Sequence, residues 1–484
     1  MNDSLDLSNE AFESLLNHTN SMVLRQFETL DSQKGYHDHS QSEVEGWFME
    51  PLPEKGMDVS ELLEFVEEKV LDTATGNLGP HMYAYVMSGG NQVAILAEKL
   101  ATTINQNQTK WHLAPAMNEI EKRVVAWTAE LLGFPQDSGG VLVSGGSAAN
   151  LTGLTVGRNI HFENSGIRKT GLFGQKPFVV YASQEVHSCV DKSVELLGIG
   201  SDYLRKIPTN AGYQIDLAIL EKQIQLDRAN GLQPFCIIGN AGTVNTGAID
   251  DLDALADLSE KYGLWYHIDG AYGALAGILD SLRAEYKGMG RADSIAIDFH
   301  KWLYQPFEGG CTLVRSWDKL KRTYFKKAAY LDTELADDGN RLEYNEHYFQ
   351  LSRNAKAFKV WMSIKAYGME RLKAMIQKDI DLTDYLNRKV NESSDFELVA
   401  DSKLAVSCFR YIEGLEGEKA ITQFNKALMP ALEKDGRVFI MGTDLKGTYA
   451  IRACLINHRK TEQTSDYLLE VIRDVAQNLN QKAS

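Results

Sequence analysis

Between about residues 101 and 330, short apolar runs alternate with segments of helical periodicity, and this alternation constrains the fold more than any other feature. The runs are continuously apolar, which is typical of strands that are covered on both faces. Strands that are separated by helices join most simply as a parallel sheet. The pattern therefore predicts an α/β fold with a mostly parallel central sheet and helices on both faces. The predicted strands are 140–144, 177–183, 234–240, 264–269, 294–298 and 310–315.

The two ends of the chain have different patterns. Residues 1–100 combine acidic helical stretches with a glycine-rich, tyrosine-bearing loop at 76–90, and the last ~110 residues alternate helices with strands such as 407–412. The local pattern does not assign a function to the first segment, and its expected role in dimerisation is an implication of the family resemblance described below. The predicted parts are an N-terminal helical segment (1–100), a large domain (101–370) and a small C-terminal α+β domain (371–484).

Composition excludes several classes of function. The net charge is 50 − 66 = −16, which argues against binding to nucleic acid or to an anionic membrane. The five cysteines are scattered and odd in number, so we expect no disulfide framework, no metal site and a reducing cytoplasm. The N-terminus MNDSLDLSNE lacks a basic segment followed by an apolar one, and no apolar run approaches the ~18 residues of a membrane span, so neither a signal peptide nor a membrane helix is predicted.

Four chemically distinctive features follow predicted strands. SGGSAAN (144–150) opens a helix with small residues, which let backbone N–H groups approach an anion. It lacks the lysine of a P-loop and the spacing of a dinucleotide-binding turn, so neither ATP nor NAD is favoured. The other three features are His187, Asp269 and Lys301, each at or just past the carboxyl end of a predicted strand.

Taken alone, each feature has an ordinary explanation: a glycine turn, a hydrogen-bonded histidine, a helix-capping aspartate and a solvated lysine. Together, at successive strand ends of one sheet, they form the set that is needed to hold pyridoxal 5′-phosphate. The lysine would form an imine with the aldehyde, and the aspartate would keep the pyridine nitrogen protonated. The histidine would stack on the ring, and the glycine–serine turn would take the phosphate.

Four blocks in the chain resemble, in the same order, those of the group II pyridoxal 5′-phosphate-dependent amino-acid decarboxylases, in particular the aromatic-L-amino-acid decarboxylases. The blocks are WHLAPAMNEIE (111–121), SGGSAANL (144–151), HIDGAYG (267–273) and DFHKWL (298–303), and the resemblance extends from about residue 45 to 460. It implies the type I fold of pyridoxal phosphate enzymes and the decarboxylation of an L-amino acid to an amine and CO2. It also implies an obligate homodimer with active sites at the subunit interface and N-terminal helices that wrap around the partner.

The resemblance further implies roles for individual residues, with Ala271 and His187 packing on opposite faces of the cofactor ring. The implied catalytic residues are Lys301, His187, Asp269 and Tyr344. The implied cofactor-binding residues are Gly146, Ser147, His187, Thr243, Asp269, Ala271, His300 and Lys301.

In this family a loop tyrosine returns a proton to the substrate Cα. The stretch 330–345 is polar, acidic and rich in turn residues, and we expect it to be a mobile loop. Counting back nine positions from Arg353 selects Tyr344 as the donor, and Tyr348 lies close to it in the sequence.

The expected substrate is an aromatic amino acid, because aromatic residues stand where aromatic-amino-acid decarboxylases carry pocket aromatics. These residues are Tyr85, Tyr272 and Phe307. Asn77 and Thr109 depart from that pattern, so an acidic or diamino substrate (aspartate, glutamate, cysteine sulfinate or 2,4-diaminobutyrate) stays an alternative. Aldehyde-forming decarboxylation with oxidative deamination is disfavoured because the residue aligned with the loop tyrosine is not phenylalanine. A non-catalytic interaction protein is disfavoured because Lys301 and Asp269 are both present.

Overall fold

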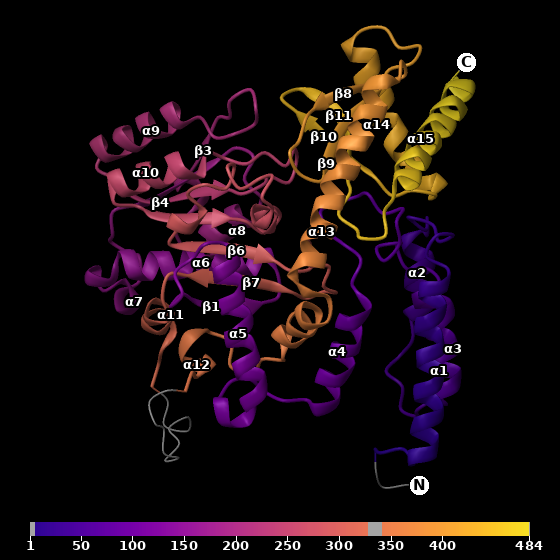
Figure 1. The fold of residues 1–484 in the computed structure, drawn as a ribbon, viewed down its shortest axis with the longest axis horizontal. Helices are drawn as coiled ribbons and strands as arrows, with labels where there is room; N and C mark the ends of the chain where they lie inside the picture. The colour runs from indigo at the N-terminus through magenta and orange to yellow at the C-terminus, as the bar shows by residue number, and fades with distance from the viewer. Residues whose placement is uncertain (1–4, 328–340, 484) are drawn as a thin grey trace.

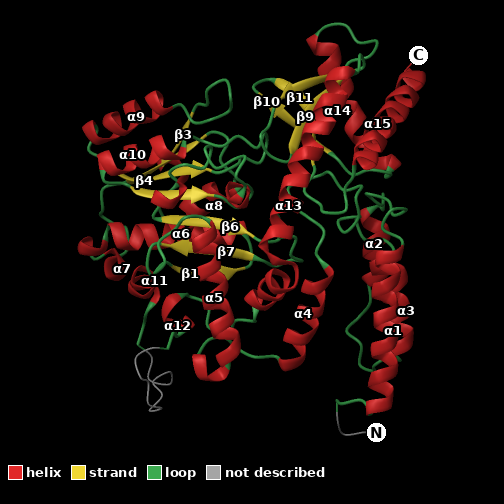
Figure 2. Ribbon diagram, in the orientation of Figure 1, coloured by secondary structure: helices red, strands yellow, loops and turns green. Residues whose placement is uncertain are grey.

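The structure is a computed structural model that describes residues 5–327 and 341–483. Its central element within these ranges is a seven-stranded sheet in the order β1-β7-β6-β5-β4-β2-β3 (Figures 1 and 2). Neighbouring strands run parallel from β3 to β6, whereas β7 is antiparallel to both β1 and β6. The predicted α/β fold with a mostly parallel central sheet is therefore confirmed. The strands are β1 (Gly139–Val143), β2 (Phe178–Ser183), β3 (Leu204–Ile207), β4 (Gln233–Asn240), β5 (Trp265–Asp269), β6 (Ser294–Asp298) and β7 (Gly310–Val314).

Apolar side chains cover both faces of this sheet. Val179 and Tyr181 of β2 belong to the hydrophobic cluster that includes α9 and α10, whereas Val180 and Ala182 belong to the cluster of α6 and α8. Successive side chains of a strand point to opposite faces, so burial on both sides explains the continuous apolar runs. The prediction missed β3, because this edge strand has the sequence LRKI and only its first and last residues are buried. The helices around the sheet are α5 (Pro115–Leu131), α6 (Gly146–His161), α7 (Ile167–Thr170), α8 (Cys189–Leu196), α9 (Leu217–Ala229), α10 (Leu252–Tyr262), α11 (Trp317–Tyr324) and α12 (Tyr344–His347).

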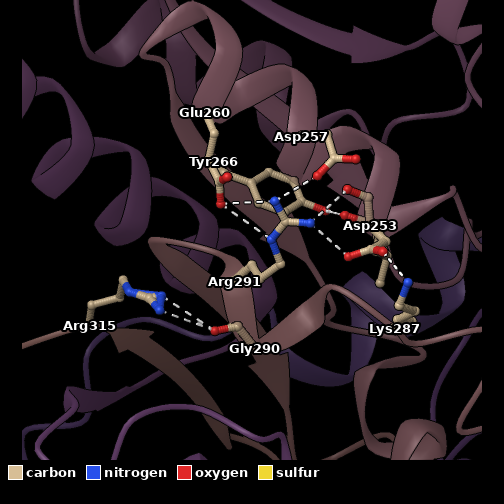
Figure 3. A network of polar contacts seen from close by, with 9 residues as sticks. Asp253, Asp257, Glu260, Tyr266, Lys287, Gly290, Arg291 and Arg315 are labelled. Atoms are coloured by element: carbon tan, nitrogen blue, oxygen red, sulfur yellow. Dashed lines mark hydrogen bonds and ion pairs between the residues drawn. The ribbon is translucent and has the colours of Figure 1, made fainter.

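The connection that leads into β6 is fastened to α10 by a network of charged side chains (Figure 3). The guanidinium of Arg291 lies 2.7 Å from Asp253, 2.7 Å from Asp257 and 2.9 Å from Glu260, all on α10. Lys287 contacts Asp253 as well. Single exposed ion pairs contribute little to stability, but one guanidinium shared by three carboxylates fixes the approach of the chain to the strand. The network thus helps to place the strand that Lys301 follows.

A second, antiparallel sheet in the order β10-β11-β9-β8 forms the core of the C-terminal part. The long helix α13 (Lys356–Glu392) runs from the central sheet to this second sheet and is interrupted at Gly368, whose φ is 70°. The predicted domain boundary at residue 370 lies beside this interruption and stays a prediction. The elements of this part are β8 (Phe396–Ala400), β9 (Val406–Tyr411), α14 (Glu418–Asp435), β10 (Met441–Leu445), β11 (Thr448–Cys454) and α15 (Glu462–Ala483).

The first three helices lie along one side of the molecule, below the C-terminal part in the view of Figure 1, whereas the fourth packs against α13. The backbone of the segment after α1 pairs with the C-terminal part, where Tyr36 N donates to Gly436 O at 3.1 Å. Large apolar side chains on these helices are exposed, among them Phe12, Leu24 and Phe48. The helices are α1 (Asn9–Glu28), α2 (Gln41–Phe48), α3 (Val59–Val66) and α4 (Gln92–Ile104). Among the described residues, no helix has both the length and the apolar character that crossing a membrane requires.

Candidate active site

A cavity of about 420 Å³ lies at the carboxyl ends of the parallel strands, where open α/β sheets hold their ligands. All the predicted cofactor-binding residues line it, although they come from five separate strand ends and turns. Lys301 follows β6, Asp269 ends β5, and His187 lies past β2. The structure therefore brings together the four features that the sequence suggested one by one.

The first turn of α6 approaches the strand ends closely because Gly146 has no side chain. A Cβ at Gly146 would lie 2.7 Å from Asp298 Oδ2 and 2.9 Å from the Cβ of Ala271. The helix is held against β5 by Asn150, whose Oδ1 is 2.8 Å from His267 Nε2. The free N–H groups and the dipole of this helix N-terminus favour an anion beside Ser147.

Lys301 contacts a carboxylate that the sequence interpretation did not assign. Its Nζ lies 3.5 Å from Asp298 Oδ2, and His300 Nε2 lies 3.4 Å from the same oxygen. Burial, followed by the charge of Lys301, lowers the pKa of His300 to about 3, so this ring is neutral at pH 7. Burial raises the pKa of Asp298 to about 6, against the attraction of Lys301. Asp298 opens the DFHKWL block at a strand end, and that position was the signal that could have identified it.

Asp269 and His187 are held by short backbone contacts. Asp269 Oδ1 accepts a hydrogen bond from Ala271 N at 3.2 Å. His187 Nδ1 accepts from Cys189 N at 3.2 Å, which places the proton of the neutral ring on Nε2. Burial lowers the pKa of His187, so the neutral form is the one that faces the cavity. A neutral aromatic ring and a carboxylate on one cavity wall suit a flat, cationic heteroaromatic ligand.

These residues fit pyridoxal phosphate. Asp298 Oδ1 and His300 Nδ1 are buried and have no hydrogen-bond partner among the described residues, so the cavity offers polar atoms to a ligand. The same cavity combines a primary amine, a carboxylate, a neutral imidazole and a helix N-terminus, which match the aldehyde, ring nitrogen, ring face and phosphate of this cofactor. Thr243 lines the cavity as well, and its Oγ1 accepts from Ala248 N at 3.1 Å.

The predicted substrate residues are divided between two cavities. Tyr85 and Tyr272 line the cavity of Lys301. Asn77 and Phe307 line a neighbouring cavity of about 630 Å³, together with residues of the N-terminal segment. Thr109 lines neither of these two cavities and instead accepts a backbone hydrogen bond from Asn345 at 3.1 Å. Glu185 and Asn240 also line the Lys301 cavity, and sequence interpretation did not select them.

Tyr344 is not brought to the cavity. Its side chain is fully buried, and the guanidinium of Arg353 lies 4.6 Å from the centre of its ring. Arg353 in turn forms a buried ion pair with Glu121. Burial raises the pKa of Tyr344 well above its usual value, which keeps the phenol protonated. Its role as proton donor stays a prediction that this placement does not support, and most of the predicted loop 330–345 lies outside the described residues.

The comparisons with known proteins agree with this site. Residues 46–412 match the family described as the pyridoxal-dependent decarboxylase conserved domain. An aromatic-L-amino-acid decarboxylase of Bacillus atrophaeus is 33% identical over 481 residues, which cover 99% of this chain and 98% of that protein. The chain belongs to the pyridoxal-dependent decarboxylase family, and it is a pyridoxal phosphate-dependent amino-acid decarboxylase.

Two solved structures share the fold. The structure of Oryza sativa TDC with PLP and tryptamine has a TM-score of 0.92 at 24% identity, covering 98% of this chain and 99% of that one. The glutamate decarboxylase domain of diaminobutyrate-pyruvate transaminase and L-2,4-diaminobutyrate decarboxylase from Vibrio parahaemolyticus has a TM-score of 0.86 at 28% identity. It covers 98% of this chain and 97% of that one. The predicted type I fold of pyridoxal phosphate enzymes is therefore confirmed.

Replacing Asp298 by asparagine should stabilise the cofactor-free protein at pH 8. The pKa of Asp298 rises from its ordinary value of 3.8 to about 6 in the folded protein, so the folded protein holds this proton more tightly than the unfolded chain does. As the pH rises between these two values, the unfolded chain loses the proton first, and the free energy of unfolding falls. The loss is on the order of 3 kcal/mol above pH 6, and Asp298→Asn avoids it because asparagine resembles the protonated acid. The melting temperature of the variant should exceed that of the wild type at pH 8, and the difference should disappear near pH 4. A lower melting temperature at pH 8 would mean that Lys301 stabilises the carboxylate more than burial disfavours it.

Proposed function

We propose that this decarboxylase acts on an aromatic L-amino acid and releases the corresponding amine and CO2. The proposal rests on one observation: Tyr85 and Tyr272 line the same cavity as Lys301 and Asp269, so aromatic side chains lie beside the reacting groups. The similarity to the Bacillus atrophaeus aromatic-L-amino-acid decarboxylase supports the proposal over nearly the full length of both chains.

The predicted cofactor-binding residues divide the tasks of this reaction among them. When bound, pyridoxal phosphate supplies an aldehyde and an electron-accepting ring, which stabilise the charge that is left on the substrate Cα as CO2 departs. Lys301 Nζ supplies the amine that holds the cofactor covalently, and the Asp269 carboxylate keeps a proton on the ring nitrogen. His187 would orient the ring by stacking, and Gly146, Ser147 and His300 would hold the phosphate.

Part of the cavity wall is shielded from water, which favours loss of CO2. Tyr272 and Ala271 are buried, so the part of the cavity that they line is shielded from water. A water-poor space favours the neutral product over the carboxylate. Tyr85 is 49% exposed and lies at the cavity, where its ring is free to contact an aromatic substrate side chain.

An acidic or diamino substrate is the second candidate, and one observation favours it. Asn77 Oδ1 is buried, lines the neighbouring cavity and has no hydrogen-bond partner among the described residues, so it could bind a polar substrate group there, whereas Thr109 Oγ1 is also unpartnered but lines neither cavity. The similarity to the Vibrio parahaemolyticus domain, whose description includes L-2,4-diaminobutyrate decarboxylase, agrees with this candidate.

The assembly and location belong to the same proposal. The enzyme acts as a cytoplasmic homodimer with active sites at the subunit interface. Exposed apolar side chains support an interface: Leu96, Leu100 and Ile104 of α4 are each at least half exposed. The five cysteines are all free thiols, which agrees with a reducing compartment.

A product screen tests the proposed substrate. The purified protein with pyridoxal phosphate is incubated separately with each of the twenty amino acids and with Dopa, 5-hydroxytryptophan, 2,4-diaminobutyrate and cysteine sulfinate. Amine, aldehyde and ammonia are measured by mass spectrometry. We expect amine from tryptophan, tyrosine, phenylalanine or their hydroxylated forms, at a kcat/KM at least about tenfold above that for any acidic or diamino substrate. The reverse order would reject the aromatic assignment, and aldehyde with ammonia as the main products would reject amine formation.

A further inference from the structure

The segment that follows Lys301 adopts a backbone conformation that side chains rarely tolerate. Leu303 has a φ of 96° and Tyr304 a φ of 53°, so two consecutive non-glycine residues lie in the left-handed region. Such residues persist only when the surrounding structure holds them in place. The segment 301–304 therefore needs strong partners, and these partners also determine where Lys301 lies.

The backbone of this segment is held from the loop before α4. Ser88 Oγ donates to His300 O at 2.8 Å. Asn91 donates to Tyr304 O twice, from its backbone N at 2.8 Å and from its side-chain Nδ2 at 2.9 Å. These contacts fix the two ends of the turn, but they do not contact the side chains within it.

The side chains of the turn share one carboxylate. Trp302 Nε1 donates to Asp379 Oδ2 at 3.0 Å, and Tyr304 Oη donates to the same oxygen at 2.7 Å. All three side chains are at most 2% exposed. Hydrogen bonds to an ionised acceptor in a dry interior are short and strong, and an unpaired donor there is costly. A single oxygen thus accepts both side-chain donors of the residues that surround Leu303.

Asp379 connects two parts of the molecule. It lies on α13 beyond the interruption at Gly368, in a stretch whose Tyr385 donates to Asp466 of α15 at 2.9 Å and whose Asn387 accepts from Ser407 of β9 at 2.5 Å. Trp302 stacks on Tyr272 at 5.2 Å between ring centres, and Tyr272 lines the cavity. The carboxylate of the C-terminal part therefore reaches the cavity wall through two aromatic rings.

We propose that Asp379 is a positioning residue, which sets the orientation of Lys301 by holding Trp302 and Tyr304 on one carboxylate oxygen. It touches neither substrate nor cofactor, and it acts through the turn 301–304. The inference holds for any amino-acid substrate, because it concerns how the lysine is presented to the cofactor.

Burial and the neighbours of Asp379 act in opposite directions on its charge. Burial raises its pKa to about 7, and the hydrogen bonds from Tyr304 and Trp302 oppose that rise. The buried Lys460 ammonium acts in the same direction as these bonds, and its Nζ donates to Pro80 O at 2.8 Å and to Met82 O at 2.6 Å. Burial lowers the pKa of Lys460 to about 7. The other groups that face this region are His458, whose ring packs edge-on to Tyr304, and Cys454.

Two conservative variants test the proposal without deleting the turn. Tyr304→Phe removes one donor and keeps the ring, and Asp379→Asn keeps the shape and removes the charge. Tyr266→Phe is the matched control, because Tyr266 is equally buried and its Oη donates to a backbone oxygen, Leu252 O, at 2.9 Å outside the cavity. The measurements are the melting temperature, the rate of pyridoxal phosphate loss in the absence of substrate, the pH midpoint of the visible absorption of the bound cofactor, and kcat and KM for the best substrate.

We expect Tyr304→Phe and Asp379→Asn each to speed cofactor loss about tenfold, to lower kcat by a similar factor, and to shift the pH midpoint, with KM changed less than about twofold. The double variant should lose less than the sum of the two single losses, because Asp379→Asn weakens and Tyr304→Phe removes the same hydrogen bond. Tyr266→Phe should lower the melting temperature and change none of the other values. If the Tyr304 and Asp379 variants behave like this control, Asp379 stabilises the fold only and the proposal is wrong. Cofactor uptake by the wild type is measured first, so a failure of cofactor binding itself is distinguished from a failure of this inference.

Discussion

Replacing Lys301 by alanine is expected to abolish turnover and the visible absorption of the bound cofactor. Lys301 is the amine in the cavity that can bond to the aldehyde, and its Nζ is held 3.5 Å from Asp298. Without it, pyridoxal phosphate can bind only through its phosphate and ring, so amine release should fall by about four orders of magnitude or more. The fold should survive, because loss of the Lys301 charge raises the pKa of Asp298 further above about 6, so this carboxyl can take up a proton instead of staying as an unpaired buried charge.

Lys319→Ala is the matched control for this experiment. Lys319 is also partly buried and lies 3.4 Å from an aspartate, Asp293, but on α11 away from the cavity. This variant should keep normal absorption and activity. Absorption by the cofactor and amine release are measured on both proteins, together with their oligomeric state in solution. Normal amine release by Lys301→Ala would reject the assignment of Lys301 as the cofactor-binding lysine.

Asp269→Asn is expected to lower kcat by several orders of magnitude. The change keeps the shape of the side chain and its contact with Ala271 N, but it removes the negative charge that holds a proton on the ring nitrogen. The interaction is buried, because Asp269 is only 8% exposed. A shielded pair of this kind stabilises the charged ring by about 3–5 kcal/mol, which corresponds to about two to four orders of magnitude in rate.

The loss should appear in kcat, with the affinity for pyridoxal phosphate changed far less. Asp227→Asn is the control for the loss of a buried carboxylate. Asp227 lies on α9, is 1% exposed and pairs with Arg205 of β3 at 2.8 Å. The control should lower the melting temperature and leave kcat unchanged. An Asp269→Asn enzyme whose kcat stays within threefold of wild type would show that this carboxylate is only structural.

Much of the fold could be predicted from the sequence, because strands that are buried on both faces appear as continuous apolar runs. Both ends of β6 (Ser294–Asp298) were predicted correctly, because every residue of the strand is buried and its last residue is charged. β3 was missed because an edge strand needs little apolar surface. The direction of β7 was not predictable from its own residues, because an apolar run is the same whether its neighbours are parallel or antiparallel.

The gathering of the predicted cofactor-binding residues at one edge of the sheet was also predictable, for a related reason. Gly146, Asp269 and Lys301 follow strands, and the ends of parallel strands meet at one edge of the sheet. Residues that lie next to a strand end in the sequence must therefore be neighbours in space. Asp298 could have been included by the same rule, since it ends β6.

Contacts between distant parts of the chain were decided by the tertiary structure alone. Tyr344 was chosen by counting along a polar stretch, but Arg353 and Trp317 pack against its ring in the interior, away from the cavity. Asn77 and Phe307 share a cavity with the N-terminal segment, and nothing in their local sequence indicates this. Asp379 lies 75 residues after Tyr304, within a long helix whose other residues give no sign of the bond. Local sequence determines which segments are buried, because burial depends on the pattern of apolar residues. Which polar side chains contact each other depends on how the segments pack, and the local sequence does not show that packing.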